Sequence, residues 1–189
     1  VGVSLTALNP DLTGRIDARV SMRGEGAALN GELDANLSGA RERGAKAEQS
    51  LDATIHGDLR DKVMTIRANG SNPQGLKAEA DLTLPTEASA KPFRLAIDRT
   101  RAVQGRFFAQ GEIKPLWDLL VGPERGLSGK IDAEGSLAGT LADPRLIGRA
   151  SIAGGKFEDG QTGLRLQDVA ISAALADNAI DVSKAQGSD

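Results

Sequence analysis

Several side chains that carry structure or chemistry in other proteins are scarce in this 189-residue chain. It has no cysteine, which excludes disulfide bonds and thiolate metal sites. It has no tyrosine, and aromatic residues make up only 3% of the sequence, so large rings do not fill its core. No apolar run reaches the length of a membrane-spanning helix or a signal peptide.

Neither the basic nor the acidic residues are clustered in the sequence. The formal net charge is -3, from 23 Lys and Arg against 26 Asp and Glu. A nucleic-acid surface needs clustered cations to displace counterions, so no nucleic-acid partner is expected. The single histidine, His56, follows Ile55 in an alternating run and is expected to face water. No grouping of His, Asp or Glu indicates a catalytic or metal site, and we expect no enzymatic activity and no cofactor.

What the chain has in abundance is alternation of apolar and polar residues. Residues 12–24 place Leu, Gly, Ile, Ala, Val, Met and Gly at even positions and mostly Arg, Asp and Ser between them. Residues 127–139 show the same alternation. A period of two is typical of a β-strand with one wet face. Such runs recur along the chain with turn residues between them, which predicts an all-β fold.

The alternating runs define the strands that we expect. They cover Val3–Leu8, Leu12–Met22, Leu29–Leu37, Leu51–Leu59, Met64–Ala68, Leu76–Leu84, Phe93–Ile97, Gly105–Ile113, Leu127–Leu137, Leu146–Ile152, Leu164–Leu175 and Ile180–Val182. Two stretches, Gly39–Ser50 and Pro85–Pro92, are richer in charge or proline and are expected to be looser.

One segment breaks the period of two. In residues 114–123, apolar residues recur at helical spacing, Pro115 stands near the start and Gly122-Pro123 at the end. This pattern predicts one short helix near 115–121. Its Trp117 has two interpretations: the helix covers an end of the sheet, or the indole faces lipid at the mouth of a groove.

The apolar face of the expected strands contains many Gly and Ala residues, at positions where a packed β core usually has Val, Ile or Phe. These small residues either let the sheet bend and approach closely or leave a furrow wide enough for an acyl chain. Both interpretations hold together in a strongly curved sheet. An internal repeat, Leu12–Ala18 and Leu127–Ala133, indicates an open array of strand units in place of a closed barrel.

The second half of the chain contains five segments that are similar to one family. They are Pro115–Leu120, Leu127–Gly135, Gly139–Gly148, Gly154–Phe157 and Thr162–Val169. Together they resemble the C-terminal region of the TamB family, the inner-membrane-anchored subunits of the translocation and assembly module, related to AsmA-like bridge proteins. The resemblance begins near residue 112, and the first half is assigned by continuity.

The resemblance implies that residues 1–189 are one β-repeat segment of a longer protein, divisible into 1–111 and 112–189. It implies an elongated, strongly curved repeat sheet, β-taco-like or β-solenoid-like, with a hydrophobic interior groove. The parent protein would be anchored in the inner membrane of a Gram-negative bacterium, with this segment in the periplasm. The family is associated with phospholipid movement to the outer membrane and with outer-membrane protein assembly alongside TamA, a barrel protein. The expected partners are therefore phospholipid acyl chains and TamA, and no catalytic residues are carried over.

In a lipid conduit, the apolar residues at every second position of each strand would face the interior of the groove. The residues expected to line such a groove are Ile16, Val20, Leu33, Leu37, Ile55, Leu59, Ile66, Leu82, Leu95, Ile97, Phe107, Ile113, Ile131, Leu137 and Ile152. A register error of one residue would turn any strand's set outward.

Two other functions stay open at the level of sequence. A scaffold would bind TamA or outer-membrane barrel precursors through its strand edges by β-augmentation. A polysaccharide-active β-helix would bring two carboxylates together from distant rungs, although the chain lacks the aromatic platforms that sugar clefts usually present. The Asp143-Pro144 pair has the form of a structural turn between strands, with a contact site as the alternative.

Overall fold

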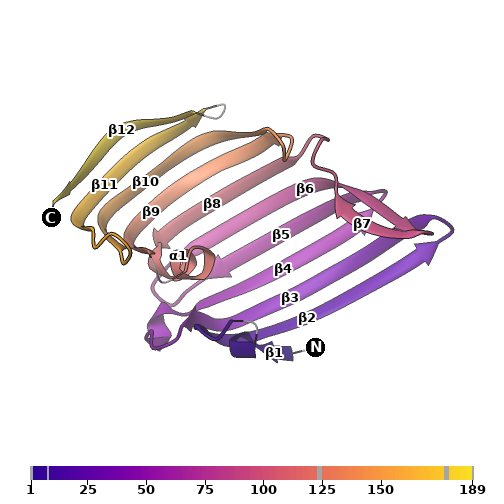
Figure 1. The fold of residues 1–189 in the computed structure, drawn as a ribbon, viewed down its shortest axis with the longest axis horizontal. Coiled ribbons are helices and arrows are strands. Elements are labelled where there is room, and N and C mark those ends of the chain that lie inside the picture. Colours follow the sequence, from indigo (N-terminus) through magenta and orange to yellow (C-terminus); the bar gives the residue numbers. More distant parts are fainter. Residues whose placement is uncertain (1, 8, 123–124, 177–178, 189) are drawn as a thin grey trace.

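The computed structural model contains one antiparallel sheet that stays open at both edges (Figure 1). It describes residues 2–7, 9–122, 125–176 and 179–188. The hydrogen-bonded order is β1-β2-β3-β4-β5-β6-β8-β9-β10-β11-β12, and β7 pairs with β6 off this path. The expected all-β fold with one short helix is therefore confirmed. Because every pairing is antiparallel, the architecture is not the β-helix on which the polysaccharide alternative depended.

The elements follow the alternating runs closely. The strands are β1 (Gly2–Ser4), β2 (Leu12–Glu25), β3 (Ala28–Glu42), β4 (Leu51–Arg60), β5 (Val63–Ser71), β6 (Lys77–Ala90), β7 (Phe93–Ile97), β8 (Gln104–Glu112), β9 (Arg125–Gly139), β10 (Pro144–Asp159), β11 (Arg165–Ala176) and β12 (Ala179–Ser188). The helix α1 spans Lys114–Leu120, with short 3-10 turns at Leu5–Ala7 (η1) and Ala47–Gln49 (η2). Pro123, expected to close the helix, lies outside the described residues.

Two sequence expectations about local structure were wrong. The first strand ends at Ser4, and the chain continues as the η1 turn; Leu8, its expected end, lies outside the described residues. The stretch from Pro85 is not loose, because β6 runs on to Ala90 and pairs there with β7. Pro85 is tolerated because it forms the last pair with β5, so its missing N–H lies where β6 leaves the main sheet.

Strand pairing places the apolar residues of successive strands on one side of the sheet. Cross-strand partners share a face, and one row of partners runs Val20, Leu33, Gly57, Ile66, Leu82, Gly105 and Leu137. We call this side the apolar face. Its larger members are Ile16, Val20, Met22, Leu33, Leu37, Ile55, Ile66, Leu82, Phe107, Ile131, Leu137, Leu146, Ile152, Ile171 and Leu175. We call the opposite side, which carries most of the Arg, Asp and Glu residues of the strands, the charged face.

The internal repeat seen in the sequence has a structural counterpart. Gly14 in β2 and Gly129 in β9 have φ angles of +128° and +121°, which residues with a Cβ rarely adopt. Each stands at a shift of register with the next strand. A Cβ on Gly14 would lie 2.8 Å from the Cα of Ala40, and a Cβ on Gly129 would lie 2.7 Å from the Cα of Gly155. The repeated glycine therefore builds the same β-bulge twice, and bulges bend a strand and increase its twist.

The buried core lies at the two ends of the strands, and the middle of the apolar face is left partly open. At one end, α1 packs against β3 and β9, and the buried residues there are Ala40, Leu51, Leu76, Ile113 and Leu127. At the other end, residues 85–90 of β6 and the strand β7 cross in front of the sheet (Figure 1). Beneath them Leu29, Leu59 and Ala88 form a buried cluster.

The bulge geometry predicts a large effect of a side chain at position 129. Gly129→Val should lower the free energy of unfolding by about 3 kcal/mol, because the left-handed φ and the backbone of Gly155 both oppose a Cβ. Gly126→Ala in the same strand is the matched control, since its Cβ would meet its nearest neighbour at 3.8 Å. The control should change stability by less than about 0.5 kcal/mol in urea unfolding. Equal stability of the two variants would contradict the bulge.

Candidate functional site

Most of the residues expected to line a groove lie together on the apolar face, and they remain partly or largely exposed. They are Ile16, Val20, Leu33, Leu37, Ile55, Ile66, Leu82, Phe107, Ile131, Leu137 and Ile152. Val20 is the most open of them, at 60% exposure, because it lies near the β2 edge of the sheet. The sheet therefore brings side chains from eight strands into one continuous apolar surface.

The other four expected residues lie elsewhere. Leu59, only 2% exposed, is buried against Ala88, and Ile113, 7% exposed, is buried at the N-terminal end of α1. The chain itself covers both, so neither is available to a ligand. Leu95 and Ile97 belong to β7, which pairs with β6 away from the main sheet, and both are exposed.

The positions that looked empty in the sequence are covered by neighbouring side chains. A Cβ on Gly105 would lie 2.6 Å from Leu82 Cδ2, so the leucine extends over the next strand. A Cβ on Gly135 would lie 2.7 Å from Phe107 Cζ, so the ring covers that glycine. At these two positions a large side chain lies across a small neighbour, so the glycine leaves no hole in the apolar face.

A depression of about 690 Å³ extends over residues of β6, β8, β9, β10 and β11. It includes the row Phe107, Gly135, Gly148 and Leu175, and Gly135 and Gly148 pair directly with each other. Most of its lining residues, among them Glu79, Arg106 and Glu134, belong to the charged face. With two paired glycines, only the backbone separates the two faces at this point.

Sequence reasoning did not include three exposed apolar residues in the expected lining. Met22 (50% exposed) and Leu146 (40%) lie on the apolar face, and Phe93 (68%) lies on β7. Met22 could have been included from the sequence, because it stands two residues after Val20 and therefore shares its face of the strand. Leu146 pairs with Leu137, a relation that depends on strand register and was not visible before the fold.

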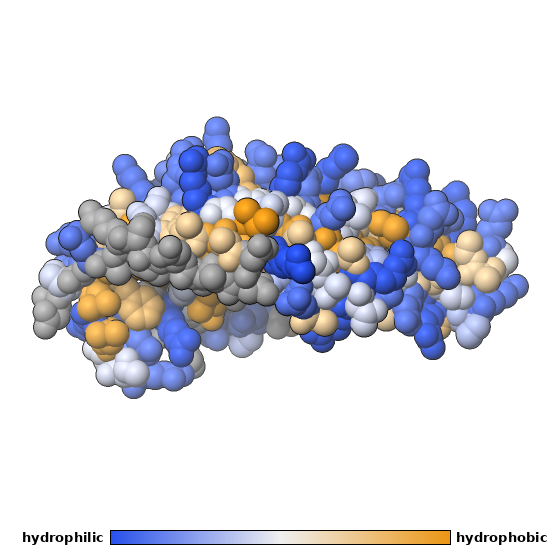
Figure 2. Space-filling model, turned by 90° about the horizontal axis from the view of Figure 1, so that it is seen from above, coloured by the Kyte–Doolittle hydropathy of each residue, from blue (hydrophilic) through white to orange (hydrophobic). Residues whose placement is uncertain are grey.

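The charged face carries ion pairs between neighbouring strands. Arg106 and Arg67 approach Asp81 at 3.1 and 3.8 Å, and His56 Nδ1 lies 2.7 Å from Asp34. The expectation that His56 faces water is confirmed by its 54% side-chain exposure. Exposed pairs of this kind contribute little stability each. Viewed edge-on, long hydrophilic side chains project from one side of the sheet along its length (Figure 2).

A further ion pair lies at the β1 edge. Arg15 Nε donates to Asp17 Oδ2 at 2.7 Å, and this hydrogen bond lowers the pKa of Asp17. Both side chains of the pair are exposed, so this side of β2 stays hydrated.

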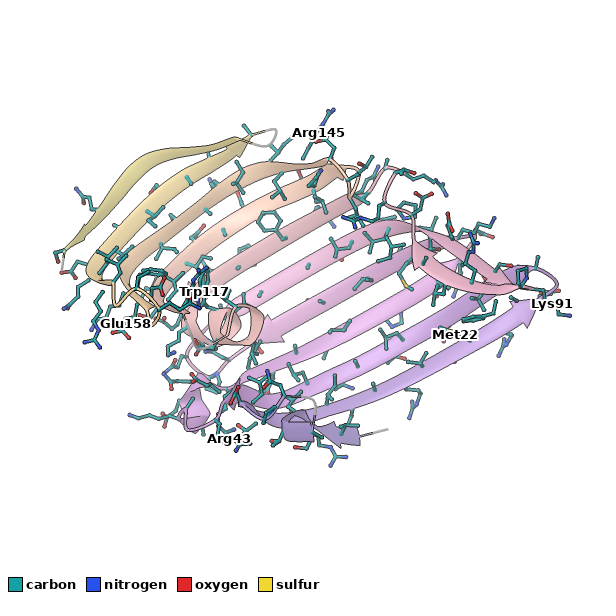
Figure 3. All side chains as sticks on the ribbon, viewed as in Figure 1. Met22, Arg43, Lys91, Trp117, Arg145 and Glu158 are labelled. Atoms are coloured by element: carbon teal, nitrogen blue, oxygen red, sulfur yellow. The ribbon has the colours of Figure 1, made fainter. Side chains whose placement is uncertain are left out.

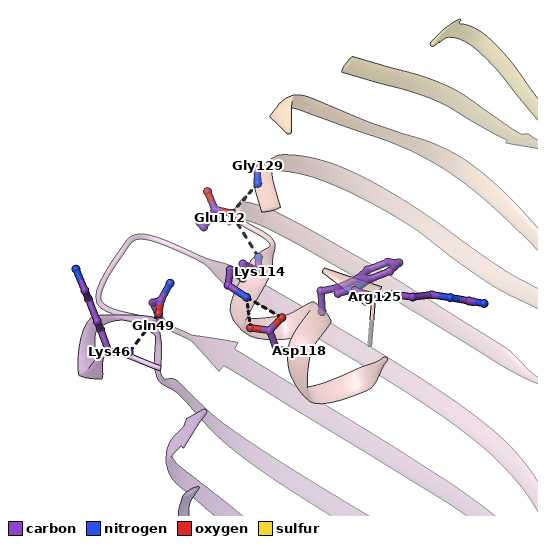
Figure 4. A network of polar contacts seen from close by, with 8 residues as sticks. Lys46, Gln49, Glu112, Lys114, Asp118, Arg125 and Gly129 are labelled. Carbon is purple, nitrogen blue, oxygen red and sulfur yellow. Dashed lines mark hydrogen bonds and ion pairs between the residues drawn. The ribbon is translucent and has the colours of Figure 1, made fainter. Parts of the chain in front are cut away.

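Polar contacts surround the helix α1, and one of them joins it directly to the sheet (Figure 4). Trp117 Nε1 donates to the carbonyl of Arg125 at 2.6 Å, and Lys114 Nζ lies 2.8 Å from the buried carboxylate of Asp118. Glu112 Oε1 accepts from the N–H of Gly129 at 2.7 Å. Since the indole is tied to the chain and half-buried, the helix covers a sheet end, as the first interpretation of Trp117 proposed.

The Asp143-Pro144 pair forms the expected structural turn. The N–H of Asp143 donates to Thr140 Oγ1 at 3.0 Å, and the N–H of Thr140 donates to the carbonyl of Asp143 at 3.1 Å. Pro144 then begins β10, where it pairs with Gly139.

The described residues contain no group of three or more His, Asp or Glu that could hold a metal ion. Within the same part of the chain, no helix is sufficiently long and apolar to cross a membrane. Comparison with protein-family models, curated proteins and solved structures gave no match. The site therefore has to be interpreted from its own chemistry, which is apolar surface that gains about 25 cal/mol per Å² when it leaves water.

The division between covered and open apolar residues is testable by stability measurements. Leu59→Ala should lower the free energy of unfolding by about 2–5 kcal/mol, because it leaves a cavity under Ala88. Val20→Ala should change it by less than about 1 kcal/mol, because Val20 already contacts water. Urea unfolding of both variants measures the difference. A large loss in Val20→Ala would mean that the surface is covered in solution.

Proposed function

We propose that this chain is a segment of a periplasm-spanning protein whose apolar face passes phospholipid acyl chains between the inner and outer membranes. The observation that carries the proposal is the continuity of the apolar face from β2 to β11. With strands about 4.8 Å apart, the surface extends roughly 40 Å across the sheet. Uninterrupted apolar surface of this size is unusual on a protein that binds nothing there.

The mechanism of such a conduit is passive. Acyl chains exchange water for contact with leucine, isoleucine and phenylalanine side chains, and each buried methylene gains about 0.8 kcal/mol. The smooth surface, where Leu82 covers Gly105 and Phe107 covers Gly135, provides no deep pocket that would hold one chain at one position. A lipid can therefore move from row to row without crossing a large barrier, with its headgroup kept in water.

The resemblance of residues 112–189 to the TamB family supports the same function. It implies a parent protein anchored in the inner membrane of a Gram-negative bacterium, with TamA as its outer-membrane partner. An open sheet that lengthens by addition of strand units, with its bulge repeated at Gly14 and Gly129, is consistent with a longer array of this kind.

A second candidate function is supported by the edge of β2. Within the described residues, the short β1 pairs with Arg15, Ile16 and Asp17, and residues 19–25 of β2 pair with β3 alone. A long strand edge of this kind can accept a strand from another protein. The chain would then act as a scaffold that aids assembly of outer-membrane proteins with TamA.

Photocrosslinking at alternating positions of β9 tests the conduit. Photoreactive residues at 131 and 137 should crosslink to phospholipid in vesicles, because these positions share the apolar face and are partly exposed. Positions 130, 132 and 134 on the charged face are the matched controls and should give no adduct. Equal labelling of both sets would overturn the proposal.

A charge on the apolar face should abolish lipid binding. Leu137→Asp places a carboxylate in the row that runs from Val20 to Leu137, so phospholipid adducts from position 131 should be lost while circular dichroism stays unchanged. Prolines within residues 19–25 should leave these adducts intact under the conduit function. If the prolines abolish TamA binding and Leu137→Asp leaves lipid adducts unchanged, the scaffold is the correct function.

A further inference from the structure

Residues 85–90 of β6 and the strand β7 form a hairpin, which we call the clasp, that lies in front of one end of the sheet (Figure 1). The N–H of Thr86 donates to the carbonyl of Lys62 at 2.7 Å, and the N–H of Ala90 donates to the carbonyl of Ala27 at 3.0 Å. The two acceptors belong to the turns that join β4 to β5 and β2 to β3. The β6 half of the clasp is therefore hydrogen-bonded to the turns at this end of the strands.

Side chains hold the same half of the clasp against the apolar face. Ala88, only 3% exposed, packs in the buried cluster with Leu29 and Leu59. Ala90 lies over Gly24 of β2, since a Cβ on that glycine would be 2.8 Å from the Ala90 Cβ. With its backbone bonded to the turns and its alanines on the sheet, the β6 half is a fixed support for β7.

The hydrogen bonds of the β6 half decide where the main chain of β7 points. In an antiparallel pair, the N–H and C=O of one residue point either both toward the partner strand or both away from it. The N–H groups of Thr86 and Ala90 point to the turns, so the even-numbered residues of this half point away from β7. Their cross-strand partners are Phe93, Leu95 and Ile97. These three residues therefore direct their N–H and C=O groups to the outer edge of β7.

The outer edge of β7 lies over the body of the sheet. The β6 half has the turns on one side and β7 on the other, so β7 stands further from the strand ends than β6 does. Among the residues that the structure describes, no other strand pairs with this edge. A row of main-chain donors and acceptors is thus open above the apolar face.

The side chains of the same three residues are also uncovered. Cross-strand partners share a face, and Ala88 packs onto the sheet, so Phe93, Leu95 and Ile97 face the sheet as well. They are nevertheless 68%, 39% and 49% exposed. In Figure 3, Lys91 marks the tip of the clasp and Met22, itself 50% exposed, lies at the same end of the sheet. The apolar side of β7 therefore faces the sheet without packing against it.

The opposite side of β7 carries Arg94 and Ala96, and the charge there is already balanced. Arg94 Nη1 lies 2.8 Å from Glu87 Oε2 of the β6 half. The groups of β7 that lack a partner in the described part of the chain are therefore its outer main-chain edge and its apolar side.

These two features together identify the chemistry of the occupant. An acyl chain would cover the apolar side chains but could not bond to the N–H and C=O groups beside them. A polypeptide strand does both, because its main chain pairs with the edge while every second side chain turns to the apolar side. An extended segment about as long as the five residues of β7 would match the edge.

We propose that the outer edge of β7 binds an extended strand of a partner protein with apolar residues at every second position. The clasp then becomes a three-stranded sheet, and the apolar side chains of the added strand turn toward the apolar face. This edge is separate from that of β2. The inference goes beyond the proposed function, because the occupant is a protein and covers part of the surface over which lipid would move.

A fluorescent synthetic peptide of alternating valine and threonine, about as long as β7, tests the proposal on the whole chain. The peptide should bind, and two N-methylated forms should separate main-chain pairing from apolar contact. One form is methylated on the valine amides and the other on the threonine amides, so one of them removes the donors that face β7. That form should bind about tenfold more weakly, while the other binds as the unmodified peptide does. Equal binding of all three peptides would overturn the proposal.

A pair of variants at Leu95 tests the edge from the side of the protein. Leu95→Pro removes an N–H that points away from β6, so the pairing within the clasp keeps its hydrogen bonds. Leu95→Ala is the matched control, since it loses the same side chain and keeps the N–H. The proline variant should bind the peptide about tenfold more weakly than the alanine variant, with circular dichroism and thermal unfolding alike in both. Equal binding by the two variants would mean that the edge is not used.

Failure of this proposal is distinguishable from failure of the conduit. Leu137→Asp lies in β9, away from the clasp, so it should lose lipid adducts and keep peptide binding. If the wild type binds lipid and no peptide, the conduit stands and the strand site is overturned. With peptide and phospholipid vesicles both present, a photoreactive group at position 95 should label the peptide. Labelling of lipid alone, or of a second copy of the chain, would show a different occupant and overturn the proposal.

Discussion

A single sheet has two faces, and the rest of this structure follows from how the chain covers one of them. In a sandwich, a second sheet would pack on the apolar side and complete a core. Here α1 at one end, and at the other the hairpin of residues 85–97 (the clasp), cover only the two ends of the strands, where Leu76 and Leu59 are buried. The middle of the apolar face keeps its contact with water. This uncovered surface is the basis of the functional proposals, and it exists because the described part of the chain has no second layer.

Packing within the sheet replaces part of what a second layer would supply. At two positions a large side chain lies over a small neighbour: Leu82 over Gly105 and Phe107 over Gly135. Each such contact removes apolar area from water without adding another element. The same arrangement makes the surface even. A feature that stabilises an open sheet therefore also prepares it to contact a long, flexible apolar chain.

The charged face decides which side of the sheet contacts water, and it adds little to the stability of the fold. Its ion pairs, such as Arg149 with Glu134 at 2.9 Å, are exposed and worth little individually. Their position on every second residue nevertheless decides which side of the sheet stays wet. A slip of one residue would exchange the faces, and the bulges at Gly14 and Gly129 are two of the places where the register shifts.

The amino-acid sequence alone determined the fold class, the position of the helix, the repeat and the face on which Ile16, Leu82 or Leu137 lies. It could do so because side-chain direction in a strand alternates locally, whatever lies further along the chain. Only the tertiary structure decided which apolar residues are covered. Leu59 and Val20 share a parity pattern, but one is buried because Ala88 reaches it from the clasp. The clasp itself depends on hydrogen bonds from Thr86 and Ala90 to turns far away in sequence. Such contacts between distant segments leave no periodic trace, which is why the stretch after Pro85 looked loose until its partners were seen.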